Sequence, residues 1–268
     1  MTAQLLIIGG GRMGTALLEG IVASGMIRPQ EIVVVEPDAE RRAMLRLAHD
    51  DLVLVDTPEL SHIGTETGAI IAVKPEVAEG ATRLAGGLGV ARILSVVAGV
   101  SSARLEATLV APIPVIRAMP NTPALVGAGM TVISGGSQVT KEDLDWAERL
   151  LSAVGTVLRL PERHLDAVTG VSGSGPAYIF LVAESLIEAG VTAGLPREVA
   201  RTLTVETILG AGRLLVESGQ SPEELRAQVT SPGGTTAAAI RALEARAVRS
   251  AFVEAVMAAV ERSKTLGR

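Results

Sequence analysis

The feature that most constrains the fold of this chain is a glycine-rich turn directly after its first apolar run. Leu5–Ile8 reads as a short buried strand, and residues 9–14, Gly-Gly-Gly-Arg-Met-Gly, lead from it into a segment with helical spacing. Between a strand and a helix, the pattern G-x-G-x-x-G is typical of a dinucleotide site. Gly9 permits the tight turn, Gly11 lets backbone amides approach a pyrophosphate, and Gly14 allows close helix packing. The alternative is a tight glycine turn that binds nothing.

The first 160 residues alternate between short apolar runs and helical segments. The runs have no polar side, as expected for strands of a parallel sheet that helices cover on both faces. They are Leu5–Ile8, Ile32–Val35, Leu52–Val55, Ala69–Val73, Ile93–Val97 and Pro114–Arg117. Two further runs, Met130–Ser134 and Thr156–Leu160, bracket a helix near residues 141–154 and are expected to extend the sheet at one edge. The pattern predicts an α/β fold in which residues 1–160 form a Rossmann-type, doubly wound dinucleotide-binding domain.

Beyond residue 160 the strand pattern ends and helical spacing takes over. We expect residues 161–268 to form an all-α domain, with helices over Ala177–Ala189, Glu198–Glu217 and Ala247–Ser263. The segments between Tyr178 and Val216 are apolar around most of the helix circumference, so these helices need burial on more than one side. A domain of this size offers little room for that within one chain, which predicts a homodimer with a shared helical core. The alternative is that the first domain covers these helices.

Composition excludes several classes of protein. Lys and Arg number 24 against 29 Asp and Glu, and there are only four aromatic residues, so nucleic acid is not an expected partner. The chain has no cysteine and three scattered histidines, so we expect no metal site and no disulfide. No apolar run is long enough for a membrane span, and the first residues do not resemble a signal peptide. We therefore expect a cytoplasmic protein with no membrane partner.

The end of the second predicted strand bears on the choice between NAD and NADP. Glu36 stands where an acid can accept hydrogen bonds from the adenosine ribose and repel a 2′-phosphate, which favours NAD. Arg41 and Arg42 follow closely, and a guanidinium there could receive that phosphate. The alternative is that both arginines lie on a solvated helix face. The residues leave the choice of cofactor open.

Three more segments follow predicted strands at the crevice where an open α/β sheet binds ligands. Lys74 lies in Ala-Val-Lys-Pro at 72–75, and small residues end the fifth strand near Gly99. Asn121 lies in Met-Pro-Asn-Thr-Pro at 119–123, a rigid turn that could position a nicotinamide carboxamide, or could simply reverse the chain. The expected cofactor-binding residues are Gly9, Gly11, Arg12, Met13, Gly14, Glu36, Ala72, Val73, Lys74, Pro75, Ala98, Gly99 and Asn121.

Two clusters of small residues mark the helical domain, at 170–178 and at 230–236. Each is expected to precede a helix and to expose backbone amides beside Ser and Thr hydroxyls, which suits a carboxylate or phosphate. Ordinary capped loops are the alternative. Neither cluster contains His, Lys, Asp or Glu, so a general base for alcohol oxidation is not evident. A protonated C=N bond needs only orientation, exclusion of water and a hydrogen bond to nitrogen, so the chemistry favours imine reduction, although His164 or Tyr178 could still supply a proton.

The whole chain resembles pyrroline-5-carboxylate reductase over about residues 4–264. The resemblance rests on the glycine turn and four further segments, of which the last two are the most specific. They are Ala72–Pro75, Met119–Pro123, Asp166–Tyr178 and Ser231–Thr236.

This resemblance implies reduction of 1-pyrroline-5-carboxylate to L-proline by NADPH or NADH, in the last step of proline biosynthesis. It also implies that the backbone of Ser231, Gly233, Gly234, Thr235 and Thr236 holds the substrate carboxylate, with the Thr236 hydroxyl on the ring nitrogen as the catalytic contact. The family further implies an interlocked homodimer, often with five dimers in a ring. Many relatives carry a small polar residue and an arginine in place of Glu36-Pro37, so strict use of NADPH is in doubt.

Three other functions are open at this point. A β-hydroxyacid dehydrogenase shares the layout but would need a helix-borne lysine, and Ala177–Gly194 contains none. A non-catalytic dinucleotide-binding sensor would have no need for the Gly-Gly-Thr-Thr turn. A reductase of a related cyclic imine carboxylate remains an alternative, because one ring methylene is worth only about 1–3 kcal/mol of discrimination.

Overall fold

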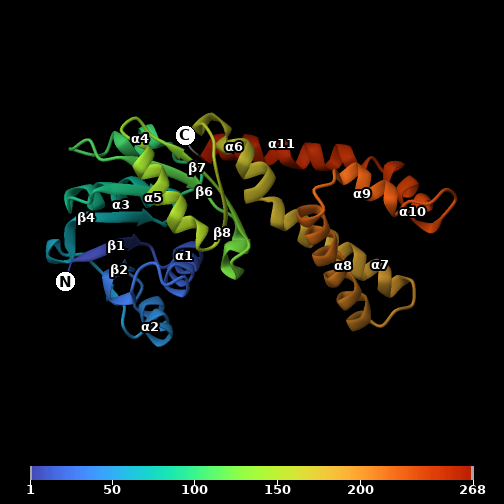
Figure 1. Cartoon of the computed structure of the whole chain (residues 1–268), viewed down its shortest axis with the longest axis horizontal. Coiled ribbons are helices and arrows are strands. Elements are labelled where there is room, and N and C mark those ends of the chain that lie inside the picture. The colour runs from blue at the N-terminus through green and yellow to red at the C-terminus, as the bar shows by residue number, and fades with distance from the viewer. Residues whose placement is uncertain (1, 267–268) are drawn as a thin grey trace. The chain divides into compact units, whose positions relative to one another are not determined.

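The computed structural model describes residues 2–266 and contains an eight-stranded sheet followed by helices (Figure 1). The strands are β1 (Ala3–Ile8), β2 (Ile32–Val35), β3 (Val53–Val55), β4 (Ile63–Ile71), β5 (Arg92–Ser95), β6 (Val115–Met119), β7 (Gly129–Gly135) and β8 (Gly155–Arg159). Their order across the sheet is β3-β2-β1-β4-β5-β6-β7-β8. Every neighbouring pair is parallel except β6 with β7, which run antiparallel. The predicted doubly wound sheet is confirmed, and its last two strands extend it at one edge.

Helices cover both faces of this sheet because successive side chains of each strand point to opposite sides. In β1, Leu5 and Ile7 belong to one hydrophobic cluster, and Leu6 and Ile8 belong to the other. The first cluster includes residues of α1 (Arg12–Ala23), α2 (Ala39–Ala48) and α5 (Lys141–Ser152). The second includes residues of α3 (Ala78–Gly87) and α4 (Ser102–Glu106). Burial on both sides explains why the strands read as continuous apolar runs.

Strand β4 is longer than its apolar run, which predicts a strand only over Ala69–Val73. It starts at Ile63, and its pairing with β1 steps from Ala3 opposite Ile63 to Leu5 opposite Gly68. Residues 64–67 therefore form a bulge that faces a single residue of β1. Because the bulge is polar, the apolar pattern of the sequence does not predict the first half of this strand.

A partly buried ion pair holds the segment that leaves the sheet. Glu162 lies in a short 3-10 helix over Glu162–His164 and accepts hydrogen bonds from the backbone and hydroxyl of Ser102, at the start of α4. Its carboxylate also lies 3.1 Å from the guanidinium of Arg117 on β6. Partial burial acts to raise the pKa of Glu162, but the hydrogen bonds from Ser102 and Arg117 outweigh it and hold the pKa below its ordinary value. The charged carboxylate is thus the form that stabilises this connection.

The remainder of the chain is helical, as expected. Its helices are α6 (Leu165–Val168), α7 (Gly175–Thr192), α8 (Arg197–Glu217), α9 (Pro222–Gln228), α10 (Thr235–Glu244) and α11 (Val248–Leu266). By contacts the chain forms two compact units, residues 175–256 and the remainder. In the unit of residues 175–256, α7 pairs with α8 in an antiparallel hairpin, and Ala247 takes a φ of 53° between α10 and α11.

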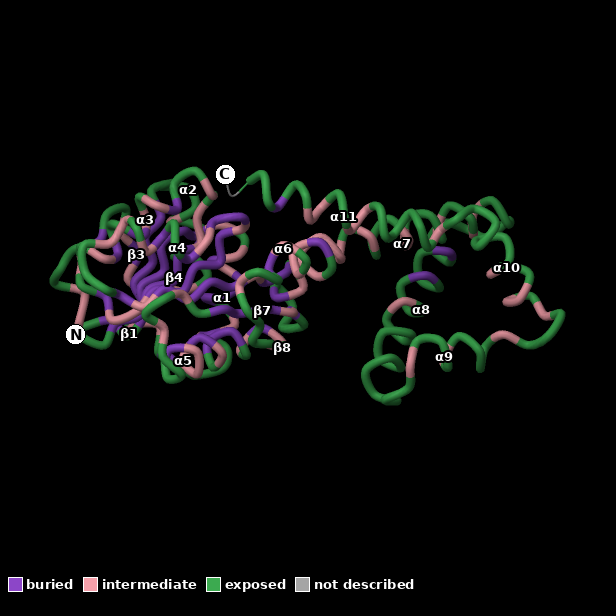
Figure 2. The backbone as a smooth tube through the Cα atoms, turned by 90° about the horizontal axis from the view of Figure 1, so that it is seen from above, coloured by how far each residue is buried: buried purple, intermediate pink, exposed green. Residues whose placement is uncertain are grey.

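The apolar faces of these helices remain open in the single chain. Figure 2 shows burial concentrated in the sheet, whereas α7–α10 are mostly exposed. Phe180 is 60% exposed, Leu181 63% and Leu203 54%. Within the described residues, α7 has no buried residue and α8 has two, Ala200 and Thr204. Large apolar side chains at this density are typical of an interface between subunits.

Candidate functional site

The glycine turn after β1 has the geometry that its sequence predicts. Gly9 adopts a φ of +110°, and a Cβ there would overlap the carbonyl of Ala72 at the end of β4. A Cβ on Gly14 would overlap the carbonyl oxygen of Gly9, so this glycine lets α1 approach the turn. Gly11 is the N-cap of α1, and no heavy atom lies within 4 Å of where its Cβ would be. Gly9 and Gly14 thus serve the turn, while Gly11 leaves open space in front of the helix amino terminus.

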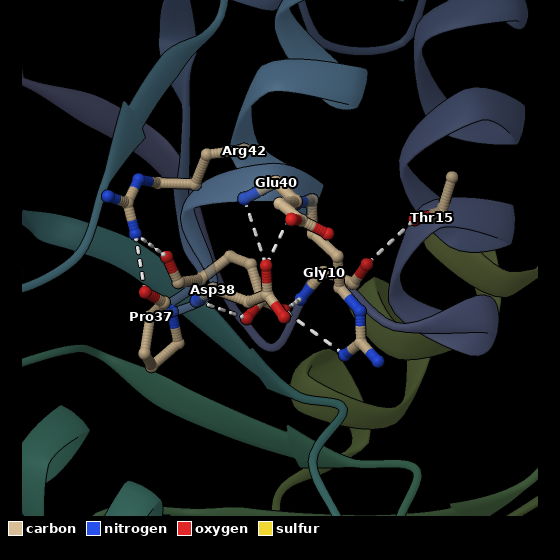
Figure 3. Close-up of polar contacts among 8 residues, drawn as sticks. Gly10, Thr15, Pro37, Asp38, Glu40 and Arg42 are labelled. Atoms are coloured by element: carbon tan, nitrogen blue, oxygen red, sulfur yellow. Dashed lines mark hydrogen bonds and ion pairs between the residues drawn. The ribbon is translucent and has the colours of Figure 1, made fainter.

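Glu36 connects this turn to the end of β2 (Figure 3). The Gly10 amide donates to Glu36 Oε2 at 2.9 Å, and the Asp38 amide donates to Oε1 at 3.0 Å. The residue is only 5% exposed. Each carboxylate oxygen can accept a second hydrogen bond, so the acid can hold the turn and still receive a ribose hydroxyl.

The two arginines that follow Glu36 differ in their contacts. Arg42 donates to the carbonyl oxygens of Glu36 and Pro37 at 2.6 and 2.7 Å, so it closes the loop at the start of α2. The Arg41 guanidinium lies 3.9 Å from the Glu36 carboxylate and its side chain is 57% exposed. Arg41 is therefore the arginine with an exposed charge beside Glu36.

A pocket of about 850 Å³ lies beside these residues, at the carboxyl ends of the neighbouring strands β1 and β4, from which the chain continues to helices on opposite faces of the sheet. This is the switch point of a doubly wound sheet, where such folds bind their ligands. The wall brings together eight of the expected cofactor residues, with Arg41 beside them. These eight are Gly9, Gly11, Arg12, Met13, Glu36, Ala72, Val73 and Lys74. Open space at Gly11, free first-turn amides of α1 and an acid at the end of β2 fit a dinucleotide.

Five expected cofactor residues lie outside the wall of this pocket. Gly14 packs beneath the turn, and Pro75 begins a short 3-10 helix, Pro75–Val77. Ala98 and Gly99 follow β5, with Gly99 at a φ of +78°. Asn121 is held by two hydrogen bonds to other segments.

Asn121 ties together two motifs that are far apart in the sequence. Its Oδ1 accepts from the Met130 amide at 2.8 Å, and its Nδ2 donates to the Ser172 carbonyl at 3.1 Å. A Cβ on Gly173 would lie 2.6 Å from Met119 Cε, so the 119–123 turn packs closely on the 169–173 segment. This tertiary contact gives Asn121 a structural role that its sequence context did not indicate.

The wall also contains residues that the sequence analysis missed. Val77, Gly80, Ala81 and Leu84 line the pocket from the start of α3 and the turn before it. Val77 is 55% exposed and Leu84 is 39% exposed, so both present apolar surface to the pocket. These residues lie at i, i+3, i+4 and i+7 just after the end of a strand, and this spacing could have predicted a helix face beside the site.

The second predicted site lies at the start of α10. Gly233 takes a φ of +72°, Gly234 is the N-cap, and no side chain caps the helix. The Gly234 amide bonds to the Ser231 carbonyl at 3.1 Å, and Thr235 and Thr236 form the first turn. An uncapped first turn with its amides and hydroxyls near the surface is the kind of anion receptor expected here.

The cluster at 170–178 differs from its prediction. It does not precede a helix but is part of one: residues 169–173 form a π-helical turn between α6 and α7. The Ser174 amide donates to the Thr169 carbonyl at 2.8 Å, so it is used within the turn. The expectation of a second nest of free amides is wrong, because glycines here permit tight helical packing rather than an open loop.

Within residues 2–266, no three His, Cys, Asp or Glu side chains are grouped so that they could hold a metal ion. Over the same residues, no helix has the length and apolar character that crossing a membrane would require.

The doubly wound sheet, the glycine turn and the acid at the end of β2 define a dinucleotide-binding protein of the Rossmann class. Residues 4–99 match the family described as NADP oxidoreductase, coenzyme F420-dependent, and residues 162–266 match pyrroline-5-carboxylate reductase dimerisation. The chain is 44% identical to a pyrroline-5-carboxylate reductase of Synechocystis over 269 residues, covering 100% of both. It is 43% identical to that of Corynebacterium melassecola, covering 98% of both. The chain belongs to the pyrroline-5-carboxylate reductase family.

Solved structures agree with this assignment. A pyrroline-5-carboxylate reductase from Coxiella burnetii superposes with a TM-score of 0.89 at 34% identity, covering 100% of both chains. The Plasmodium falciparum enzyme with NADP bound gives 0.86 at 29% identity, covering 99% of this chain and 98% of that one.

Proposed function

We propose that this protein is a pyrroline-5-carboxylate reductase, an NAD(P)H-dependent oxidoreductase that reduces the C=N bond of 1-pyrroline-5-carboxylate to give L-proline. The main observation in support of the proposal is that one chain of this family contains two separate sites. One is the pocket at Gly9–Gly14 and Glu36, and the other is the uncapped α10 terminus at Ser231–Thr236. We propose that residues 1–160 bind the dinucleotide and that residues 161–268 bind the substrate and form the dimer.

The pocket residues supply the contacts that a pyridine dinucleotide requires. When bound, the reduced nicotinamide supplies a hydride. Gly11, Arg12 and Met13 offer backbone amides and the positive end of α1 to the pyrophosphate. Glu36 accepts from the adenosine ribose, and Val77, Ala81 and Leu84 offer an apolar surface to the adenine ring. Gly14 supports the turn from below, and Ala72–Pro75, Ala98, Gly99 and Asn121 remain our proposed contacts for the other half of the cofactor.

The α10 terminus supplies what an anionic cyclic imine requires. Gly233, Gly234 and Thr235 would hold the carboxylate through their amides, and the Gly234 amide would share its hydrogen with the Ser231 carbonyl. The Thr236 hydroxyl would hydrogen-bond the ring nitrogen, and Ser231 lies beside Gly234. The carboxylate contacts orient the ring, and the Thr236 contact strengthens as the nitrogen changes from imine to amine.

The absence of an acid or base in the Ser231–Thr236 turn suits this reaction. A protonated imine already carries the proton that the product amine keeps, so hydride addition to carbon completes the reduction. An alcohol substrate would instead have to lose its hydroxyl proton to a general base. This argument favours imine reduction over ketone or alcohol chemistry at this site.

The choice between NADPH and NADH depends on the balance between Glu36 and Arg41. The Glu36 carboxylate opposes a 2′-phosphate, while the exposed Arg41 guanidinium, 3.9 Å away, can pair with one. We propose that the enzyme accepts both cofactors.

We further propose that the apolar faces of α7 and α8 meet their equivalents in a homodimer, and that the dimers assemble into a pentamer of dimers in the cytoplasm. The matched dimerisation region and the exposed side chains of these helices support the dimer. Light scattering after size exclusion would distinguish dimer from decamer.

The test of the proposed activity is to follow absorbance at the nicotinamide band with pyrroline-5-carboxylate and either NADPH or NADH. Consumption of either cofactor that depends on this substrate supports the proposal. The six-membered imine carboxylate in a parallel assay tests the related alternative, since one methylene changes kcat/KM by roughly 10–200-fold. Binding of a dinucleotide with no turnover of either imine would indicate a non-catalytic sensor.

A further inference from the structure

A second pocket lies at the opposite end of the sheet from the dinucleotide pocket. Its volume is about 540 Å³, and its walls come from the amino-terminal ends of β1, β4 and β5 and from α5. We call it the bulge pocket, and it is lined by residues 64–67, Arg92, Trp146 and Arg149, among others. The dinucleotide pocket uses the carboxyl-terminal ends of β1 and β4, so the two pockets share no residue.

The sheet is altered locally to build this pocket. All four residues of the β4 bulge line it, whereas a regular strand would have paired them with β1. The Thr67 hydroxyl holds the bulge by donating to the Ala3 carbonyl and accepting from the Gly64 amide at 2.8 Å. A Cβ at Gly68 would overlap the indole ring of Trp146, so the glycine after the bulge makes room for that side chain. Bulges of this kind commonly re-aim a strand next to a binding site.

Two arginines give this pocket its positive charge. The Arg92 guanidinium lies over the Trp146 ring, 5.6 Å from its centroid, and 3.2 Å from the buried Asp143 carboxylate. Its Nε is nevertheless buried without a hydrogen-bond partner, and a buried donor normally has one. Arg149 is exposed, one turn along α5 from Trp146, and forms no ion pair with the residues that the structure describes. The Asp143 carboxylate and the Trp146 ring thus hold Arg92 in place beside a second cation, and the part of its side chain that lines the pocket is separate from the buried Nε.

We propose that the bulge pocket binds a small organic carboxylate, with Arg149 and Arg92 as its cationic partners and Trp146 as its apolar wall. Guanidinium groups match a carboxylate in geometry and charge. Trp146 and Leu150 add apolar surface that inorganic phosphate cannot use, so an anion with a compact apolar body is preferred. Glu66, on the bulge, is an acidic residue of the wall and weakens the binding of anions. This site does not depend on the proposed reductase activity.

Trp146 is the only tryptophan of the chain, so its emission reports this pocket. The experiment titrates the whole chain with acetate, butyrate, succinate or inorganic phosphate, with chloride at equal ionic strength as the control. The readouts are tryptophan emission and its quenching by acrylamide, which measures access to the indole. We expect saturable changes with the carboxylates, tighter for butyrate than for acetate, and little response to phosphate. The response should persist in Gly234→Val, because the α10 turn is a separate place for a carboxylate and an added side chain there would overlap Ser231.

Three charge variants test the assignment. Arg149→Gln should weaken carboxylate binding roughly tenfold, since one charge-assisted hydrogen bond is lost. Glu66→Gln should tighten binding severalfold. Lys141→Gln removes the same charge from the same helix without lining the pocket, and it should leave binding unchanged.

Three results would overturn the proposal. They are the absence of any saturable change in emission or acrylamide access, phosphate binding as tight as that of butyrate, and equal losses in Arg149→Gln and Lys141→Gln.

Discussion

Two glycines of the turn, Gly11 and Gly14, predict different effects of the same substitution at positions three residues apart. An alanine Cβ at Gly14 would overlap the Gly9 carbonyl oxygen, and it would lie 3.1 Å from the Gly9 carbonyl carbon and 3.3 Å from Ala72 Cβ. Two of these contacts are to backbone, which cannot rotate away. The cost is therefore at the upper end for overpacking, about 3 kcal/mol. Replacing a helical glycine returns about 1 kcal/mol, which leaves Gly14→Ala destabilised by about 2 kcal/mol.

The matched control is Gly11→Ala. Its φ of −73° is open to any residue, and no atom lies within 4 Å of the added methyl group. The smaller entropy of the unfolded chain offsets the poorer N-cap, so its stability should stay within about 1 kcal/mol of the parent. The methyl group would nevertheless stand where a pyrophosphate approaches the helix amides. We expect NADPH to bind about tenfold more weakly, a loss of about 1.4 kcal/mol.

Thermal unfolding and NADPH titration of both variants test this pair. A chain of this size loses roughly 2–4 °C of Tm per kcal/mol, so Gly14→Ala should unfold about 4–8 °C lower and Gly11→Ala close to the parent. An unchanged Tm for Gly14→Ala would refute the reading of close helix packing. Undiminished NADPH affinity in Gly11→Ala would show that the pyrophosphate does not approach this residue.

Three further predictions follow from the site and the fold. Thr236→Ala should lower kcat/KM for the imine about tenfold or more, with cofactor affinity unchanged and Thr236→Ser restoring activity; full activity in the alanine variant would remove the catalytic role. Glu36→Gln should raise the ratio of kcat/KM for NADPH to that for NADH by a few fold, and an unmoved ratio would mean that the carboxylate does not face the ribose. Glu162→Gln should cost about 1–3 kcal/mol at neutral pH. Because the folded-state pKa of Glu162 is lowered, this difference should shrink as pH falls through that value, and a constant difference down to acid unfolding would contradict the role of the charged carboxylate.

Local patterns in the sequence were sufficient for most of the fold. The eight predicted strands all exist, because strands buried on both faces are continuous apolar runs whose partners need not be known. The β4 bulge was missed because a search for apolar runs cannot find it: residues 64–67 are polar and pair irregularly with β1. The small-residue cluster at 170–178 was wrongly predicted to expose free amides ahead of a helix, because a π-helical turn rich in glycine and serine has the same composition as such a segment.

The sequence by itself determined the glycine turn, the acid at the end of β2 and the order of strands and helices, because each depends on residues close together in the chain. Only the tertiary structure decided that Arg41 rather than Arg42 lines the pocket and that α3 supplies its apolar wall. It alone brought Asn121 to Ser172, and Arg92 to Trp146 beside the bulge. Those contacts join residues about 50 positions apart. Their partners are chosen by how elements pack, which no local pattern records.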